Sequence, residues 1–471
     1  MRRSFRSLTR VLPRAATVAM LSALALTSAA CQEDSVCTDA GGVRVCGEIG
    51  TQLYNVNLSA NPIEWPPVAV QNGELVVARG QELLRIGKNG SLTPIGSSNA
   101  ALTVPSADEN GNLYLMAGGN AQASVQALSG SDMAKARWTQ QLSGAPVGTP
   151  PSMSADTVYA ATTNWGSNAT LYALDRQSGA IRFTRSDASP AAVLADGSIR
   201  YLSGSRGIDS MWGSQLGGQP LFGSLVAEDS SGKVLWTYAF PQGVVDFAPG
   251  PKGETYAVTG GDHVLQRVSV AGQIDWTFKP DCTDCTVAAA PTVTRDVVYF
   301  PVWEKRVEPI DPLYAIDAAT GQKRWVFDGF STKKTDFSPG KYLAPGSAGV
   351  QPIDTFSTLH HPAGRPVVAQ DGTLFISTDG AVTALDRNGQ LLGIALYDAA
   401  AGEVSLNTGF MATPTTWIMP GVRPSPVLSP EGTLYVWDGA TLRAFKADKK
   451  ATNDAWVAPF GTTRNDGRLP Q

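Results

Sequence analysis

The chain repeats a short hairpin in which apolar and polar positions alternate on both sides of a glycine turn. The clearest copy has the sequence LYAIDAATGQKRWVF, over Leu313–Phe327. Alternation with a period of two is typical of half-buried strands, so Leu313–Ile316 and Gln322–Phe327 predict a strand each. Between them, Asp317 can bond its own turn and Gly321 can adopt a positive φ. Weaker copies follow the same pattern: Leu171–Phe183, Leu225–Trp236, Val268–Trp276 and Val382–Leu392.

A second hairpin precedes most of these copies. It has a strand rich in Pro and small residues, a Gly- or Asp-containing turn, and an aromatic-rich strand. Eight segments fit: Pro66–Arg79, Val104–Ala117, Pro150–Thr162, Ser189–Ser203, Phe247–Thr259, Ala289–Val302, Arg365–Thr378 and Arg423–Trp437. Two hairpins make a unit of four short strands, A to D, on a pitch of roughly 40 residues.

Such units cannot bury both faces alone, and they become stable when they stack radially around an axis. The sequence therefore predicts an all-β fold, a single β-propeller of eight four-stranded antiparallel blades over residues 51–471. Ring closure usually needs a strand from the other end of the chain. Two segments are candidates for it: Leu53–Leu58 and Ala455–Ala458.

Composition agrees with this prediction. The 471 residues include 48 Gly and 31 Pro, and only 17% are charged, which suits short strands joined by tight turns. A hydrophobic content of 43% is ample for a sizeable core. No apolar heptad pattern persists, so long helices are not expected.

Residues 1–30 are expected to be a signal peptide. Five arginines precede the apolar run Ala15–Leu26, which is too short for a stable transmembrane helix. Thr27–Cys31 resembles a bacterial lipobox, in which Cys31 would be lipidated, although Ser28 stands where Leu is usual. The alternative is ordinary signal-peptide cleavage after Ala30. Either cleavage places the protein outside the cytoplasm, and only a lipid on Cys31 would attach it to a membrane.

The number of cysteines favours lipidation of Cys31 over ordinary cleavage. If Cys31 carries lipid, the other four of the five cysteines form two local pairs, Cys37 with Cys46 and Cys282 with Cys285, as expected in an oxidising compartment. Residues 31–50 then predict a tether with a local disulfide. A redox-active or zinc-binding Cys282-x-x-Cys285 is the alternative, but no helix is expected there and the chain has only three histidines.

Net charge argues against nucleic acid as a partner. Without residues 1–30 the chain keeps 32 basic and 41 acidic residues, a net charge of −9, and no basic cluster remains.

One hairpin also carries a recognisable motif. It resembles the tryptophan-docking motif of pyrroloquinoline-quinone (PQQ)-type propellers at Ala315, Asp317, Thr320, Gly321 and Trp325. The resemblance implies that each tryptophan packs between neighbouring blades, which assigns this role to Trp138, Trp236, Trp276 and Trp325. Phe183 replaces tryptophan in its copy. Gly393 occupies the position in the seventh unit, where we expect a loosely packed seam.

The family resembled here contains quinoprotein dehydrogenases and non-catalytic relatives such as the barrel-assembly lipoprotein BamB. The dehydrogenases imply PQQ, calcium, an Asp base and often a disulfide between adjacent cysteines. This chain has no adjacent cysteine pair, and we assign no calcium ligands, metal site or catalytic residues. We therefore expect no cofactor. A PQQ- and calcium-dependent dehydrogenase remains the alternative.

Long insertions are expected on one face of the propeller. In an A-B-C-D meander, the B-to-C and D-to-A connections emerge together, and these are the long ones. They carry aromatic and histidine residues that the blade pattern does not require: Trp165, Trp212, Trp303, Trp417, Tyr342, Phe356, His360 and His361. These residues form our candidate binding face. Alternatively, they only pack the loops onto the propeller.

These observations together predict a monomeric, extracytoplasmic scaffold that is either lipid-anchored in the outer membrane or periplasmic or secreted. The expected partner of its loop-bearing face is an envelope protein or a polysaccharide. A carbohydrate-binding propeller is the second alternative to this function.

Overall fold

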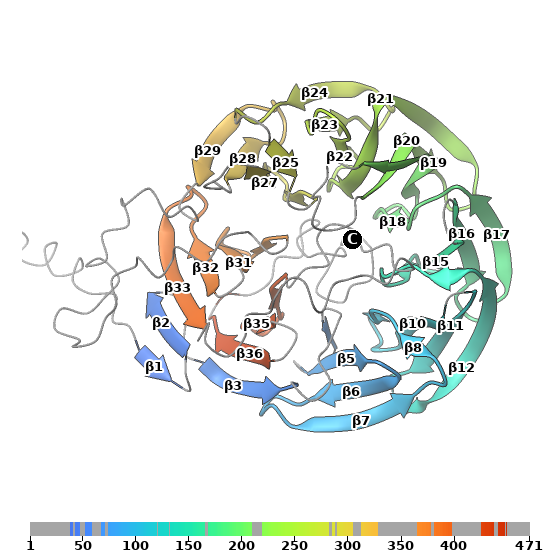
Figure 1. Ribbon diagram of the computed structural model, residues 1–471, viewed down its shortest axis with the longest axis horizontal. Helices are drawn as coiled ribbons and strands as arrows, with labels where there is room; N and C mark the ends of the chain where they lie inside the picture. The colour runs from blue at the N-terminus through green and yellow to red at the C-terminus, as the bar shows by residue number, and fades with distance from the viewer. Residues whose placement is uncertain are drawn as a thin grey trace, which may run out of the picture.

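The computed structural model describes residues 38–40, 43–47, 52–58, 67–70, 74–119, 121–130, 132–164, 168–209, 219–281, 285–287, 290–304, 312–327, 365–377, 381–397, 425–437, 441–447 and 449. Over these residues the chain is all-β and antiparallel. The sheets follow one another around a ring, from blue to red in Figure 1. The predicted propeller fold is thereby confirmed. No helix that is long and apolar enough to cross a bilayer occurs among these residues.

The first three sheets follow the chain in order. The first contains β4 (Val68–Ala69), β5 (Leu75–Arg79), β6 (Glu82–Ile86) and β7 (Leu92–Ser97). The second contains β8 (Ala101–Leu102), β9 (Ser106–Ala107), β10 (Leu113–Gly118), β11 (Gln122–Ser129) and β12 (Asp132–Ser143). The third contains β13 (Ala145–Pro146), β14 (Ser152–Met153), β15 (Thr157–Asn164), β16 (Asn168–Asp175) and β17 (Ile181–Ser186).

The fourth sheet has seven strands because one long strand joins two units. It contains β18 (Ala192–Val193), β19 (Ile199–Asp209), β20 (Gln219–Glu228), β21 (Val234–Pro249), β22 (Thr255–Thr259), β23 (Leu265–Val268) and β24 (Ile274–Phe278). The start of β21 pairs with β20, and its end pairs with β22. One strand thus serves as D of one unit and A of the next, and the count of eight separate blades stays a prediction.

Of the last three sheets, the sixth and seventh include N-terminal strands. The fifth contains β25 (Cys285–Val287), β26 (Thr292–Val293), β27 (Val297–Glu304), β28 (Leu313–Asp317) and β29 (Lys323–Phe327). The sixth has the order β1 (Thr38–Ala40), β2 (Val43–Gly47), β33 (Leu391–Tyr397), β32 (Ala381–Leu385), β31 (Leu374–Ser377) and β30 (Val367–Val368). The seventh has the order β3 (Gln52–Asn57), β36 (Thr441–Lys446), β35 (Thr433–Trp437) and β34 (Val427–Leu428).

The ring closes through β3. This strand covers most of the candidate segment Leu53–Leu58, and it pairs antiparallel with β36, with Val56 opposite Leu442. Figure 1 shows the N-terminal β3 beside the C-terminal β36. The other candidate, Ala455–Ala458, lies outside the described residues. The N-terminal strand β3 thus completes the last sheet as its fourth strand. This pairing links the two ends of the ring and removes an open sheet edge.

Residues 38–40 and 43–47 lie in the segment for which a tether is predicted. They form the hairpin β1–β2, and β2 pairs with β33 in the register Val43 to Tyr397 through Gly47 to Gly393. An outer strand presents unpaired backbone N–H and C=O groups, which another strand can satisfy. The hairpin therefore extends the outer edge of the sixth sheet.

The core lies between successive sheets. One cluster, for example, combines Tyr114 and Val125 of the second sheet with Val158 and Leu174 of the third, all buried. Burying such a side chain stabilises the fold by about 1.5–3 kcal/mol. Each sheet therefore depends on its neighbours, as expected for stacked units.

Hydroxyl groups add hydrogen bonds between the innermost strands. The Ser152 hydroxyl donates to the Ala191 carbonyl oxygen at 2.6 Å, and the Thr292 hydroxyl donates to that of Pro366 at 2.8 Å. The backbone N–H of Arg365 donates to the Ser425 hydroxyl at 2.9 Å. These residues are buried, so each bond satisfies a polar group that water does not reach.

Candidate functional site

The contacts between neighbouring four-stranded units, called seams below, hold the ring together. Four tryptophans lie in them in the same way, each packed on a turn glycine of the next unit. An added Cβ would lie 2.6–2.8 Å from the indole at each glycine. The pairs are Trp138–Gly179, Trp236–Gly272, Trp276–Gly321 and Trp325–Gly389. All four glycines have positive φ, so both the backbone and the ring exclude a side chain there.

Each indole also donates a hydrogen bond to the same turn. The indole Nε1 groups donate to carbonyl oxygens at 2.7–3.2 Å, in the pairs Trp138–Arg176, Trp236–Val270, Trp276–Ala318 and Trp325–Arg387. Gly321 and Trp325 share one hairpin, but Gly321 receives Trp276 from the preceding unit. Each copy of the motif therefore contributes to two seams. Its glycine contacts the preceding unit, and its tryptophan contacts the next unit.

Where Phe183 replaces tryptophan, Arg185 supplies the missing donor. The Phe183 ring packs 3.1 Å from the position of an added Cβ on Gly232. The Arg185 guanidinium lies 4.5 Å from the Phe183 ring centroid and donates to the Gly232 carbonyl oxygen at 2.7 Å. It also pairs with the fully buried carboxylate of Glu228 at 2.8 Å. The phenylalanine seam thus keeps both ring packing and a hydrogen bond.

The seams near ring closure are built differently. On β3, Tyr54 pairs with Ala444 and packs against Gly90, where an added Cβ would lie 2.8 Å from the tyrosine ring. Tyr54 thus takes the place of a tryptophan, a role that sequence analysis missed. The turn glycine of the first unit, which needs an aromatic ring from the last, was the available signal. In the sixth sheet the corresponding residue is Gly393, with Gly47 of β2 opposite.

The tight turns gather on one face of the ring. In the turn between β28 and β29, the Asp317 carboxylate accepts bonds from the Thr320 N–H and hydroxyl, both at 2.9 Å. The Arg324 guanidinium, 2.7 Å from Asp317, lowers the pKa of that carboxyl to about 2. The A-to-B turns reach the same end of the sheets, because antiparallel strands alternate in direction.

The opposite face carries the longer B-to-C hairpins. Strands β19 and β20 have 11 and 10 residues, whereas the neighbouring β22 and β23 have 5 and 4. β15, β16 and β27 have 8 residues each. The strands themselves therefore extend further toward this face in several units.

The predicted binding residues lie mostly beyond the described part. Trp303 lies in β27, opposite Thr286 of β25. The others lie outside the described residues: Trp165, Trp212, Trp417, Tyr342, Phe356, His360 and His361. Among the cysteines, Cys46 lies in β2 and Cys285 in β25, while Cys31, Cys37 and Cys282 fall outside the described ranges. Both disulfides and the lipidation of Cys31 stay predictions.

A buried ion pair crosses the centre of the ring. Arg365 Nη2 lies 3.0 Å from Asp246 Oδ2, and both side chains are at most 6% exposed. Asp246 lies in the inner half of β21 and Arg365 just before β30, in units that a third unit separates, so the two can meet only near the axis. Burial raises the pKa of Asp246 and lowers that of Arg365, and each charge opposes the effect on the other.

The comparisons with known proteins agree with this architecture. Residues 219–387 match the family model described as "Outer membrane protein assembly factor BamB". This segment contains the repeated hairpins that carry Trp236, Trp276 and Trp325. The chain is a β-propeller, and its residues 219–387 resemble PQQ-like repeats. A comparison with curated protein sequences finds no match.

Two solved structures show that the β-propeller fold extends over most of the chain. BamB from Moraxella catarrhalis aligns with a TM-score of 0.53 at 14% identity, covering 84% of this chain and 100% of BamB. The quinohemoprotein alcohol dehydrogenase from Comamonas testosteroni aligns with a TM-score of 0.54 at 13% identity, covering 86% of this chain and 77% of the enzyme. At these identities the likeness concerns the fold alone.

Proposed function

We propose that the protein is a non-catalytic, extracytoplasmic scaffold that binds an envelope protein or polysaccharide through its B-to-C and D-to-A face. The observation that carries this proposal is the asymmetry between the two faces. Glycine turns close one face tightly, whereas the other has the longest strands and the long insertions of the sequence. Binding residues are commonly placed on long loops that a rigid scaffold positions.

The location and partner class are proposed on separate grounds. The basic leader and Cys31 favour export and a lipid anchor. The family model that matches residues 219–387 is named for outer membrane protein assembly, and this favours an envelope protein as partner. The protein would act as a monomer, since one loop-bearing face suffices for one partner.

Site-specific photo-crosslinking in intact cells tests this proposal. A photoreactive amino acid replaces Trp303 on the loop-bearing face or, as the matched control, Val270, which is 56% exposed in a tight turn. We expect a discrete crosslinked envelope product from position 303 and none from position 270. Equal crosslinking from both positions would contradict binding through one face. In a separate pull-down from cell envelopes, Trp303→Ala with Trp417→Ala should weaken capture of the partner without changing the melting temperature.

The alternative function is a PQQ- and calcium-dependent dehydrogenase. In the described residues, no group of three or more His, Cys, Asp or Glu side chains could hold a metal ion. The buried carboxylate near the axis, Asp246, is paired with Arg365 and does not fit a calcium ligand unless that pair breaks. Incubation with PQQ and Ca²⁺ tests this alternative: a shift in quinone absorbance with dye reduction by alcohols or sugars would favour it.

A further inference from the structure

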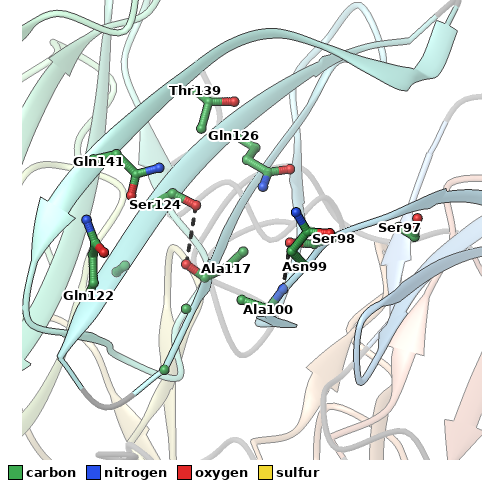
Figure 2. Close-up of a pocket in the computed structure, with 13 residues that line it drawn as sticks. Ser97, Ser98, Asn99, Ala100, Ala117, Gln122, Ser124, Gln126, Thr139 and Gln141 are labelled. Carbon is green, nitrogen blue, oxygen red and sulfur yellow. Dashed lines mark hydrogen bonds between the residues drawn. The ribbon is translucent and has the colours of Figure 1, made fainter.

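A polar pocket opens at the seam between the first and second sheets, on the loop-bearing side. Its volume is about 380 Å³, within the range of small-molecule sites. Its walls are the end of β7 with the following segment, the turn between β10 and β11, and one face of β11 and β12. Figure 2 shows these side chains around the opening.

This seam lacks the aromatic ring that fills the docked seams. The residue four positions after the turn glycine is Pro94, opposite Leu84, where the units of the docked seams have tryptophan or phenylalanine. Close to it, an added Cβ on Gly96 would lie 3.2 Å from the Met133 carbonyl oxygen. The two sheets therefore meet through backbone at this point, and the space beyond it is lined by β11 and β12.

Among the described residues, the lining is rich in amides and hydroxyls and contains no ionisable side chain. Gln126 is paired with Thr139 and Ser124 with Gln141 across the two strands, so these four side chains stand on one face of the sheet. The Ser124 hydroxyl donates to the Ala117 carbonyl oxygen at 3.4 Å. No hydrogen bond of the Gln126 or Gln141 amide group occurs within the described chain, so both groups can bond a ligand.

We propose that this pocket binds a neutral saccharide unit. Each amide offers donors and an acceptor, which matches sugar hydroxyls because these also donate and accept. A charged ligand would lose hydration without gaining a countercharge, and the small Gly, Ala and Ser residues offer little apolar area for an aliphatic ligand. The inference rests on the proposed function and deepens it: the pocket lies on the same face, but the sugar would contact the sheet and its short connections and not the long loops.

Ligand-observed NMR on the mature full-length protein tests the proposal with matched sugars. Glucose, galactose, mannose and N-acetylglucosamine are the neutral probes, and glucuronate and glucosamine are the charged counterparts of glucose. We expect saturation transfer from at least one neutral sugar with a Kd on the order of 1 mM, and at least tenfold weaker binding of the charged forms. Absence of binding by all four neutral sugars at about ten times that concentration, or equal binding of charged and neutral forms, would overturn it.

Three variants locate the binding. Gln126→Leu with Gln141→Leu removes two amides and should weaken binding by about tenfold, the effect expected of two modest hydrogen bonds. Gly119→Trp should block the pocket, because an added Cβ there meets no atom within 4 Å. Gln140→Leu, on the same strand but outside the lining, is the matched control and should bind normally. Unchanged binding by the folded Gly119→Trp variant would refute the site, whatever the outcome of crosslinking at Trp303.

Discussion

Two groups of seams hold this ring together, and they are built by different means. The docked seams, five in the described chain, join the second sheet to the sixth through Trp138, Phe183, Trp236, Trp276 and Trp325. The closing seams lie on either side of the seventh sheet and between the first and second sheets. There the corresponding residues are Gly393, Tyr54 and Pro94.

The difference shows what a repeated motif can and cannot do. Within the docked seams, a turn glycine and an aromatic ring recur at the same spacing, so each unit packs on the next in one way. At the closing seams the ends of the chain supply substitutes: Tyr54 of β3 packs on Gly90, and β2 covers the edge of β33. At Pro94 no aromatic side chain takes the place of the tryptophan, and this seam contains the polar pocket.

The largest expected effect concerns the ion pair that joins two units of the docked part near the axis. Arg365→Met leaves Asp246 buried without its countercharge and should destabilise the protein by about 3–5 kcal/mol. Urea unfolding measures this loss. Adding Asp246→Leu should restore most of the stability, because a buried pair is often replaceable by apolar side chains.

The pH dependence of the Arg365→Met variant gives a second check. Burial raises the pKa of Asp246 in the folded state, so the folded variant binds a proton more tightly than the unfolded chain. Its deficit relative to wild type should therefore be full at neutral pH and shrink as the pH falls through the folded pKa. A deficit that does not change with pH would contradict an uncompensated charge.

The second prediction compares one docked seam with one closing seam. Trp276→Ala should cost about 3 kcal/mol, since it removes a large packed ring and a hydrogen bond. Tyr54→Ala should cost about 2 kcal/mol, because a smaller ring is lost. Hydrogen exchange distinguishes the two: the first should expose amides of β24 and β28, and the second those of β3 and β36. Loss of protection at β3 and β36 in both variants would show that the seams are not independent.

The smallest expected effect concerns the turn in a docked seam. Arg324→Gln removes the charge that lowers the pKa of Asp317 to about 2. Because the unfolded pKa is about 3.9, the stabilisation is present above that value and disappears as the pH falls through about 2. At pH 7 the variant should lose less than about 1 kcal/mol, as expected for an exposed pair. Melting temperatures that still differ at low pH would contradict this origin.

The sequence alone determined the local structure of the repeats. Alternation over Leu313–Phe327 and the glycine turn specify a hairpin, since period two and positive φ are properties of neighbouring residues. The tandem units of four strands then indicated the propeller, and the resemblance to PQQ-type propellers implied its docking residues. The candidate binding residues, in contrast, came from loop sequences, where no periodicity predicts how side chains are arranged.

Only the tertiary structure decided which distant residues meet. Closure of the ring brings Tyr54 to Gly90, sets β2 against β33, and pairs Asp246 with Arg365 across the centre. It also leaves the amides of Gln126 and Gln141 facing an open seam. Local sequence patterns contain no information about these contacts. Each contact depends on how many units separate its two residues and on the curvature of the ring that the packed units form.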